Sequence, residues 1–274
     1  HSCLIFQDGL SPGQRHLLIQ CRENGIQVIG CQHGYNKTAF DIGPFAPNRF
    51  SRYWLCYGQY MIDLYQKAFG KSPTEKGWLP IGSIKHDFLH RSYRWNPNKT
   101  NGKALILHEP DTDECESDPF PLKSSDLTQK AIEALLKAGI GFDFKIHPGW
   151  PDFIGNTGIK MWRPPEATSI VDIGMKEMLN YECLIGSWSS CLLDAVAMGM
   201  PVINLNYKDY PSEGYCEWLP GKIGLFKSCD ADKIGDLIGN KSLNKYDPAK
   251  IEYILGPLGK VNEKLISFLK KSLS

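Results

Sequence analysis

Short apolar runs alternate with longer amphipathic stretches along most of this 274-residue chain. In the first third, runs rich in β-branched or aromatic residues lie at 3–6, 26–31 and 78–82, and they are expected to be strands. Helical periodicity covers 12–24, and an aromatic-rich helix is expected within 50–69. A strand, helix, strand series within about thirty residues is typical of a parallel crossover unit.

Beyond residue 103 the alternation becomes regular. Apolar runs of strand length and amphipathic runs of helix length follow one another, which predicts a doubly wound parallel sheet. A further strand is expected at 223–226 and an amphipathic helix at 261–273. The regular series consists of expected strands at 104–108, 142–147, 183–186 and 201–205, with helices at 127–138, 173–180 and 190–198.

A polar segment with Asn-Pro and Asn-Gly turn signals, residues 86–102, separates the two parts. We place a domain linker there, between an N-terminal domain over 1–95 and a C-terminal domain over 96–274. The expected fold class is α/β with two Rossmann-like domains. The strands before the linker are too few for a full domain of this kind, so the first domain is expected to be incomplete, with further residues upstream of His1.

Charge and cysteine content narrow the function classes. Lys and Arg total 31 against 30 Asp and Glu, and no polybasic stretch indicates a nucleic-acid partner. No apolar run approaches the roughly 20 residues of a membrane-spanning helix. The nine cysteines are scattered and lack zinc-ligand spacing, which favours free thiols in a reducing cytoplasm and argues against a structural metal site.

Two turns of the C-terminal domain are candidate ligand sites, because open parallel sheets bind ligands at the carboxyl ends of their strands. His147 and Pro148 follow the strand expected at 142–147, where an imidazole can donate a hydrogen bond to a phosphate. The segment Gly186-Ser187-Trp188-Ser189-Ser190 ends the next strand and opens a helix, whose N-terminus favours anions. Each turn also has a structural explanation, as a surface Pro-Gly turn and as a serine helix cap.

The N-terminal domain offers two candidates of the same kind. Asp8 follows the first expected strand and His33 follows the second. A carboxylate is a suitable general base for an acceptor hydroxyl, and a histidine is a suitable acid or phosphate ligand. Either residue could equally be an ordinary turn residue.

Other motifs point away from alternative chemistries. The acidic run around Asp111-Thr112-Asp113 has the form of a metal-diphosphate motif, but a solvated acidic loop is the commoner outcome, and we expect no metal. Neither a Gly-x-Gly-x-x-Gly fingerprint nor a Walker sequence is present. The turn at 186–190 also lacks the final glycine of a hydrolase nucleophile elbow.

Several segments together resemble a known group of enzymes. The residues Lys145-Ile146-His147-Pro148, the run from Cys183 to Ala195, and the run from Met198 to Ile203 resemble the C-terminal domain of GT-B glycosyltransferases. The His-Pro and Ser-Ser pairs resemble motifs of bacterial sialyltransferases, polysialyltransferases and related capsule enzymes. Asp8-Gly9 is similar to the end of their acidic motif, with Gln7 at one acidic position.

The sequence is also similar to teichoic-acid CDP-glycerol glycerophosphotransferases. Those enzymes carry a His-Gly turn, a His-Pro turn and a Ser-Ser segment followed by Asp and Pro. Here Gln32-His33-Gly34 and the run from Pro80 to Asp87 match the first part of that pattern, while Ser187 and Trp188 replace an aspartate and a tyrosine.

The resemblance implies a glycosyltransferase of bacterial surface polysaccharide synthesis, with a nucleotide-activated sugar donor, a cytidine nucleotide favoured, and a saccharide acceptor. It implies no cofactor, and a cytoplasmic enzyme with peripheral membrane association through regions outside this sequence. A CDP-glycerol glycerophosphotransferase-like enzyme, a UDP-GlcNAc 2-epimerase-like enzyme and a non-catalytic nucleotide-binding module stay open as alternatives. The implied donor-binding residues are His147, Pro148, Gly186, Ser187, Ser189 and Ser190, and the implied catalytic residues are Asp8 and His33.

Overall fold

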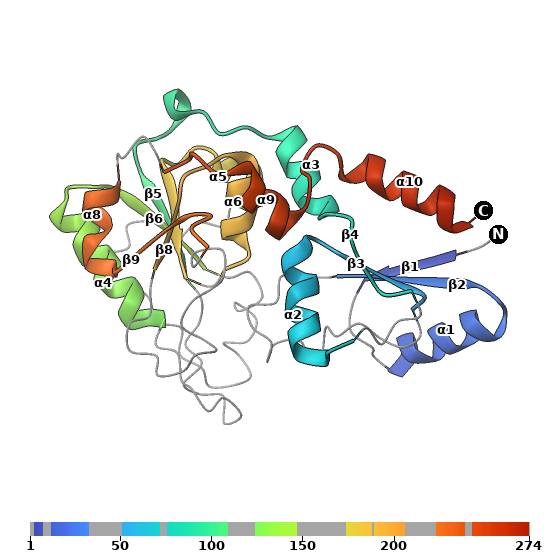
Figure 1. Ribbon diagram of the computed structural model, residues 1–274. Coiled ribbons are helices and arrows are strands. Elements are labelled where there is room, and N and C mark those ends of the chain that lie inside the picture. The colour runs from blue at the N-terminus through green and yellow to red at the C-terminus, as the bar shows by residue number, and fades with distance from the viewer. Residues whose placement is uncertain are drawn as a thin grey trace. The chain divides into compact units, whose positions relative to one another are not determined.

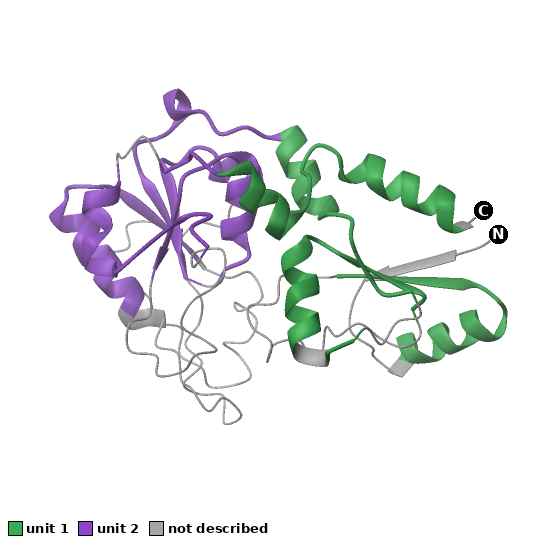
Figure 2. Cartoon of the chain, in the orientation of Figure 1, with its two compact units in different colours: residues 1–92, 247–274 green, residues 93–246 purple. Residues whose placement is uncertain are grey.

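The chain divides into two compact units (Figure 2). The first contains His1–Ser92 together with Asp247–Ser274, and the second contains Tyr93–Tyr246. The architecture comes from a computed structural model. It describes residues 3–7, 12–32, 51–71, 76–108, 124–146, 174–187, 189–205, 223–238 and 243–273.

A four-stranded parallel sheet forms the centre of the first unit (Figure 1). Its strands lie side by side in chain order, so each connection crosses over to the next neighbour. Helix α1 (Pro12–Glu23) connects the first two strands, and helix α2 (Gln59–Phe69) connects the last two. The strands are β1 (Cys3–Gln7), β2 (Gln27–Cys31), β3 (Tyr53–Cys56) and β4 (Trp78–Pro80).

Both faces of this sheet are covered by helices. Leu18 of α1 packs on Val28, and Tyr65 of α2 lies 5.7 Å, ring to ring, from Trp78. Neighbouring residues of a strand point to opposite faces. On the other face the Tyr53 ring meets Phe268 of α10 (Val261–Leu273) edge-on, with 5.0 Å between ring centroids. The result is the three-layer arrangement that a parallel sheet requires.

The end of the chain belongs to the first unit, which differs from the expected domain over 96–274. The hydroxyl of Tyr253 donates to Asp63 at 2.8 Å, and the Ser83 backbone N–H donates to the Leu255 carbonyl at 2.8 Å. The Asp87 carboxylate accepts the backbone N–H groups of Gly259 and Val261. These hydrogen bonds hold α9 (Pro248–Leu255) and the start of α10 against the first unit.

The polar segment expected as a linker also contains a helix. Helix α3 (Ile84–Ser92) begins after Ser83, whose hydroxyl oxygen accepts the His86 backbone N–H and lies 2.6 Å from His86 Nδ1. His86, Asp87 and Leu89 are buried. The first polar residues of the expected linker, His86 and Asp87, therefore lie on the buried face of a helix, and the Asn-Pro and Asn-Gly turn signals follow after Ser92.

The second unit contains a five-stranded parallel sheet in the order β6-β5-β7-β8-β9. Strand β5 pairs with β6 on one side and β7 on the other, so the strand order reverses at β5. In sheets of this kind, ligands bind outside the carboxyl ends of the strands at such a reversal. The strands are β5 (Ala104–His108), β6 (Phe142–Ile146), β7 (Cys183–Gly186), β8 (Val202–Leu205) and β9 (Lys227–Cys229).

Helices cover this sheet on two faces (Figure 1). Helix α4 (Ser124–Lys137) packs Ile132 and Leu135 on one face, where Ile234 of α8 (Ile234–Leu237) completes the core. Helix α6 (Cys191–Met198) covers the other face and is buried from Leu192 to Met198. Three short helical segments complete the described elements of this unit: η2 (Pro97–Lys99), α5 (Met175–Met178) and η4 (Ala231–Lys233).

The close approach of β2 and β3 gives a test of packing in the first unit. A Cβ atom at Gly30 would lie 2.2 Å from Trp54 Cε3, and Trp54 is fully buried. We expect Gly30→Ala to lower the free energy of unfolding by roughly 1–3 kcal/mol, as overpacking of a core does. Urea unfolding followed by circular dichroism measures this loss.

The matched control is Gly13→Ala, because Gly13 lies exposed in α1 with no atom within 4 Å of the added Cβ. Alanine there is expected to leave stability unchanged or to raise it. Equal effects of the two substitutions would contradict the packing of Trp54 on Gly30.

Candidate functional site

The carboxyl end of β7 carries four of the residues expected to bind a donor. All of β7 is buried between β5 and β8. Gly186 is its last residue, and the turn that follows buries Ser187 and Ser189 while Ser190 is exposed. These four residues therefore lie together where a doubly wound sheet binds ligands.

Gly186 is small for a packing reason. A Cβ atom there would lie 3.2 Å from Leu107 Cβ on β5 and 3.5 Å from Leu192 Cδ2 on α6. The glycine lets α6 approach the sheet closely. The start of α6 is thereby brought to the carboxyl end of the strand.

Ser190 is the N-cap residue of α6. Ser190 has helical backbone angles, and its side chain makes no capping hydrogen bond. Ser189 and Ser190 supply backbone carbonyls to the N–H groups of Leu192 and Leu193, at 3.1 and 3.0 Å. The positive end of the helix dipole lies at this turn, which favours an anionic group.

A buried carboxylate lies one turn into the same helix. Asp194 is 0% exposed and is the acidic residue in the first turn of α6. A negative charge near a helix N-terminus is stabilised by the dipole. The sequence did not identify Asp194 as a site residue, although its charge interrupts an otherwise apolar run. That interruption is the signal that could have found it.

The other expected site residues, Asp8, His33, His147 and Pro148, lie outside the described residues. Their neighbours are described: β1 ends at Gln7, and β6 ends at Ile146. In the first unit, Gln32 is buried, and its Oε1 accepts the Tyr57 backbone N–H at 2.8 Å. This contact joins the chain after β2 to the chain after β3.

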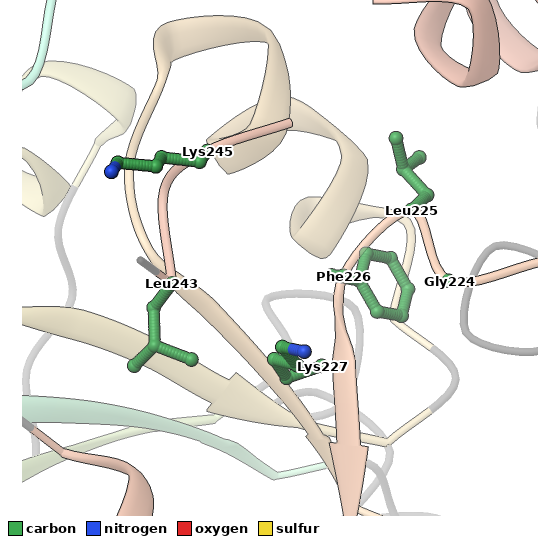
Figure 3. A pocket seen from close by; sticks show the side chains of 6 residues that line it. All are labelled: Gly224, Leu225, Phe226, Lys227, Leu243 and Lys245. Carbon is green, nitrogen blue, oxygen red and sulfur yellow. The ribbon is translucent and has the colours of Figure 1, made fainter. Parts of the chain in front are cut away.

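A cavity of about 260 Å³ lies beside the amino-terminal end of β9 (Figure 3). Its walls combine buried apolar side chains with two exposed lysines, and the described site residues Gly186, Ser187, Ser189 and Ser190 do not line it. Because the sheet is parallel, the carboxyl ends of the strands lie at the other edge. The lining residues are Gly224, Leu225, Phe226, Lys227, Leu243 and Lys245.

The described residues contain no cluster of His, Cys, Asp or Glu suited to a metal ion. Within the same parts of the chain, none of the helices combines the length and the apolar character needed to cross a membrane. Cys21, Cys31, Cys56, Cys183, Cys191 and Cys229 are free thiols.

No protein-family model matches the sequence, and no curated protein matches it. Solved structures do match. A Listeria monocytogenes protein provisionally named UDP-N-acetylglucosamine 2-epimerase is 12% identical, with a TM-score of 0.59 over 100% of this chain and 75% of that one. The UDP-GlcNAc 2-epimerase of Methanocaldococcus jannaschii in complex with UDP-GlcNAc and UDP is 11% identical, with a TM-score of 0.53 over 97% of this chain and 76% of that one.

The wall teichoic acid polymerase TagF, in a crystal soaked with CDPG, is 15% identical. Its TM-score is 0.58 over 99% of this chain and 73% of that one. At such low identity the likeness shows the fold. It confirms the α/β class with two Rossmann-like domains of the GT-B type.

A second buried carboxylate of this unit, Asp143, has an ion pair and a hydrogen bond. Asp143 of β6 is buried, with Lys103 Nζ at 2.9 Å and the Tyr181 hydroxyl donating at 2.8 Å. It lies near the amino-terminal end of β6, away from the carboxyl ends of the strands. Burial, together with the hydrogen bond and charge of Asp143, raises the pKa of Tyr181 to about 12.

This raised pKa predicts a loss of stability in alkali. In the unfolded chain Tyr181 ionises near pH 10, about two units below its folded pKa. Its contribution to stability is therefore complete below about pH 10 and is lost as the pH rises towards 12, by up to about 2–3 kcal/mol. We expect Tyr181→Phe to be less stable than the parent at pH 8 and to lose less between pH 10 and 12 in urea unfolding.

Tyr53→Phe, in the first unit, is the control, because its ring contact with Phe268 does not need the hydroxyl. Parallel pH profiles for the parent and Tyr181→Phe would contradict the assignment of this alkaline loss to Tyr181.

Proposed function

We propose that this chain is a GT-B enzyme that transfers a sugar from a nucleotide-activated donor to a growing surface polysaccharide. The observation that carries the proposal is the turn from Gly186 to Ser190. It joins a buried parallel strand to the start of a buried helix at the carboxyl ends of the strands, where sheets of this kind bind ligands. Such a turn suits a phosphate group. The fold, shared with structures that contain UDP or CDPG, supports the same assignment.

In this proposal the donor phosphates lie against the start of α6. Gly186 lets the helix begin close to the end of the strand, and Ser187, Ser189 and Ser190 lie at the turn between them. His147 follows β6 and donates a hydrogen bond to a phosphate oxygen, with Pro148 fixing its turn. A preorganised set of donors at a helix end stabilises a leaving phosphate without a metal.

Activation of the acceptor falls to the first unit. Asp8 and His33 come after the first two strands of its sheet, at the edge where ligands bind. Asp8 is the proposed general base that takes the proton of the acceptor hydroxyl, and His33 assists as an acid or a phosphate ligand. The free thiols of the described cysteines favour a reducing compartment, which supports a cytoplasmic site of action.

A cytidine nucleotide is the favoured donor. The His-Pro and Ser-Ser pairs resemble those of CMP- and CDP-using enzymes, and TagF is a structural neighbour with CDPG. An alternative reaction at the same phosphate site is the transfer of glycerol phosphate from CDP-glycerol. It would use the same phosphate site with a different transferred group.

A 2-epimerase reaction on UDP-GlcNAc is the second candidate, favoured by the two epimerase structures that share the fold. Product analysis separates the two reactions. An epimerase converts its nucleotide sugar without any acceptor, whereas a transferase needs one. A chain that binds nucleotide and converts no substrate would be a binding module.

Thermal shift with CMP, CDP, UDP and GDP tests the donor assignment. A ligand that binds the folded state stabilises it by mass action, so the nucleotide with the tightest binding gives the largest shift. We expect the cytidine nucleotides to raise the melting temperature most. A larger shift with UDP would favour the epimerase-like function, and no shift with any of the four would contradict a nucleotide site.

His147→Ala tests the proposed phosphate contact. Loss of one hydrogen bond to a charged phosphate should weaken nucleotide binding by roughly 1.5–3 kcal/mol, or about 10- to 150-fold, with an unchanged fold. Isothermal titration calorimetry measures the affinity. His16→Ala is the control, because His16 is an exposed residue of α1. Normal binding by His147→Ala would assign His147 a structural role.

A further inference from the structure

Asn204 has a buried amide that is half satisfied. It lies on β8 and is 6% exposed. Its Nδ2 donates to Ser228 Oγ of β9 at 3.4 Å, whereas its buried Oδ1 has no hydrogen-bond partner among the described residues. Nearly all buried polar atoms in folded proteins have a partner, and an unsatisfied one costs free energy. The orphaned oxygen therefore needs an explanation.

The register of the sheet places this amide beside the candidate phosphate site. Asn204 is paired with Gly186 of β7 on one side and with Ser228 of β9 on the other. Paired residues of neighbouring strands face the same side of the sheet. Since Gly186 has no side chain, the strand next to Asn204 offers no group that could satisfy the amide. The amide nitrogen bonds to Ser228 on the β9 side, and the oxygen is left without a partner in the described part of the sheet.

The chemistry of the free atom restricts what it binds. A carbonyl oxygen accepts a hydrogen bond and therefore requires an O–H or N–H donor. An ionised phosphate offers none. A nucleotide-activated donor carries hydroxyl groups on both sides of its phosphates, on the ribose and on the transferred group.

We propose that Asn204 is a specificity residue whose amide oxygen binds a hydroxyl group of the nucleotide-activated donor held at the turn from Gly186 to Ser190. The inference rests on the proposed function, because it requires the donor phosphates at the start of α6. The amide then distinguishes ligands by their hydroxyl groups, whereas the turn and the helix end bind the phosphates common to all of them.

Asn204→Leu tests this with opposite expectations for stability and binding. Leucine has the same branched skeleton of four heavy atoms as asparagine and removes the unsatisfied amide, so stability should be unchanged or higher. Affinity for the donor should fall about 5- to 20-fold, which is the size expected for the loss of one neutral hydrogen bond. Calorimetry on the full chain uses CDP-glycerol, a CMP-linked sugar and UDP-GlcNAc, and urea unfolding measures stability.

Two further ligands identify the hydroxyl. If Asn204 binds the ribose, the parent binds the 2′-deoxy or 3′-deoxy nucleotide more weakly than the unmodified nucleotide. The Asn204→Leu variant then binds the deoxy and unmodified nucleotides equally. If Asn204 binds the transferred group, parent and variant bind CDP or UDP equally and differ with the complete donor. Either result supports the proposal.

Ser228→Ala is the matched control, because it removes the other partner of the amide and leaves Oδ1 in place. It should retain most of the donor affinity. Equal binding by the parent and Asn204→Leu would overturn the role of Asn204 and leave the proposed function standing. A parent that binds none of the probes would overturn both.

Asn204→Ala provides a second variant for the case in which leucine prevents folding. The same loss of affinity is expected there. A less stable alanine variant with parental affinity would make Asn204 structural and would overturn the proposal.

Discussion

The burial of β7 is the constraint on which the second unit depends. All four residues of this strand are buried, with β5 on one side and β8 on the other. A strand in this position must be apolar on both faces, and the helix that follows it must pack closely. Gly186 allows that approach, because any larger residue would press on Leu107 and Leu192. Packing therefore fixes the start of α6 at the carboxyl end of β7.

A different interaction organises the first unit. The Asp87 carboxylate accepts backbone N–H groups of Gly259 and Val261, which lie more than 170 positions further along the chain. Its other oxygen lies 3.0 Å from Arg91 Nε. Hydrogen bonds to a carboxylate are stronger than neutral ones. One buried residue of α3 thus joins the two segments of the unit, and the second unit lies between them in sequence.

Much of the second unit could be predicted from apolar periodicity, because buried parallel strands read as continuous apolar runs. Apolar periodicity gave wrong element bounds where buried residues do not belong to a strand. Leu225 and Phe226 are buried but precede β9, which begins at Lys227. In the first unit, residues 50–69 read as one aromatic stretch, and the structure divides them into β3 and α2. Helix α3 could not be predicted from apolar periodicity, because its buried face includes the polar residues His86 and Asp87, which are hydrogen-bonded.

Some residues of the candidate site could be predicted from the sequence, whereas others depend on how neighbouring strands pair. Gly186, Ser187, Ser189 and Ser190 follow an apolar strand, and the rule that ligands bind at strand ends selects them from sequence alone. Asn204 could not be selected in this way, because one asparagine within an apolar strand has no distinctive spacing. Its importance appears when the pairing of β7 with β8 sets it beside a glycine. Strand ends select the groups proposed to bind phosphate, and the pairing between strands selects the residue proposed to recognise a hydroxyl group of the donor.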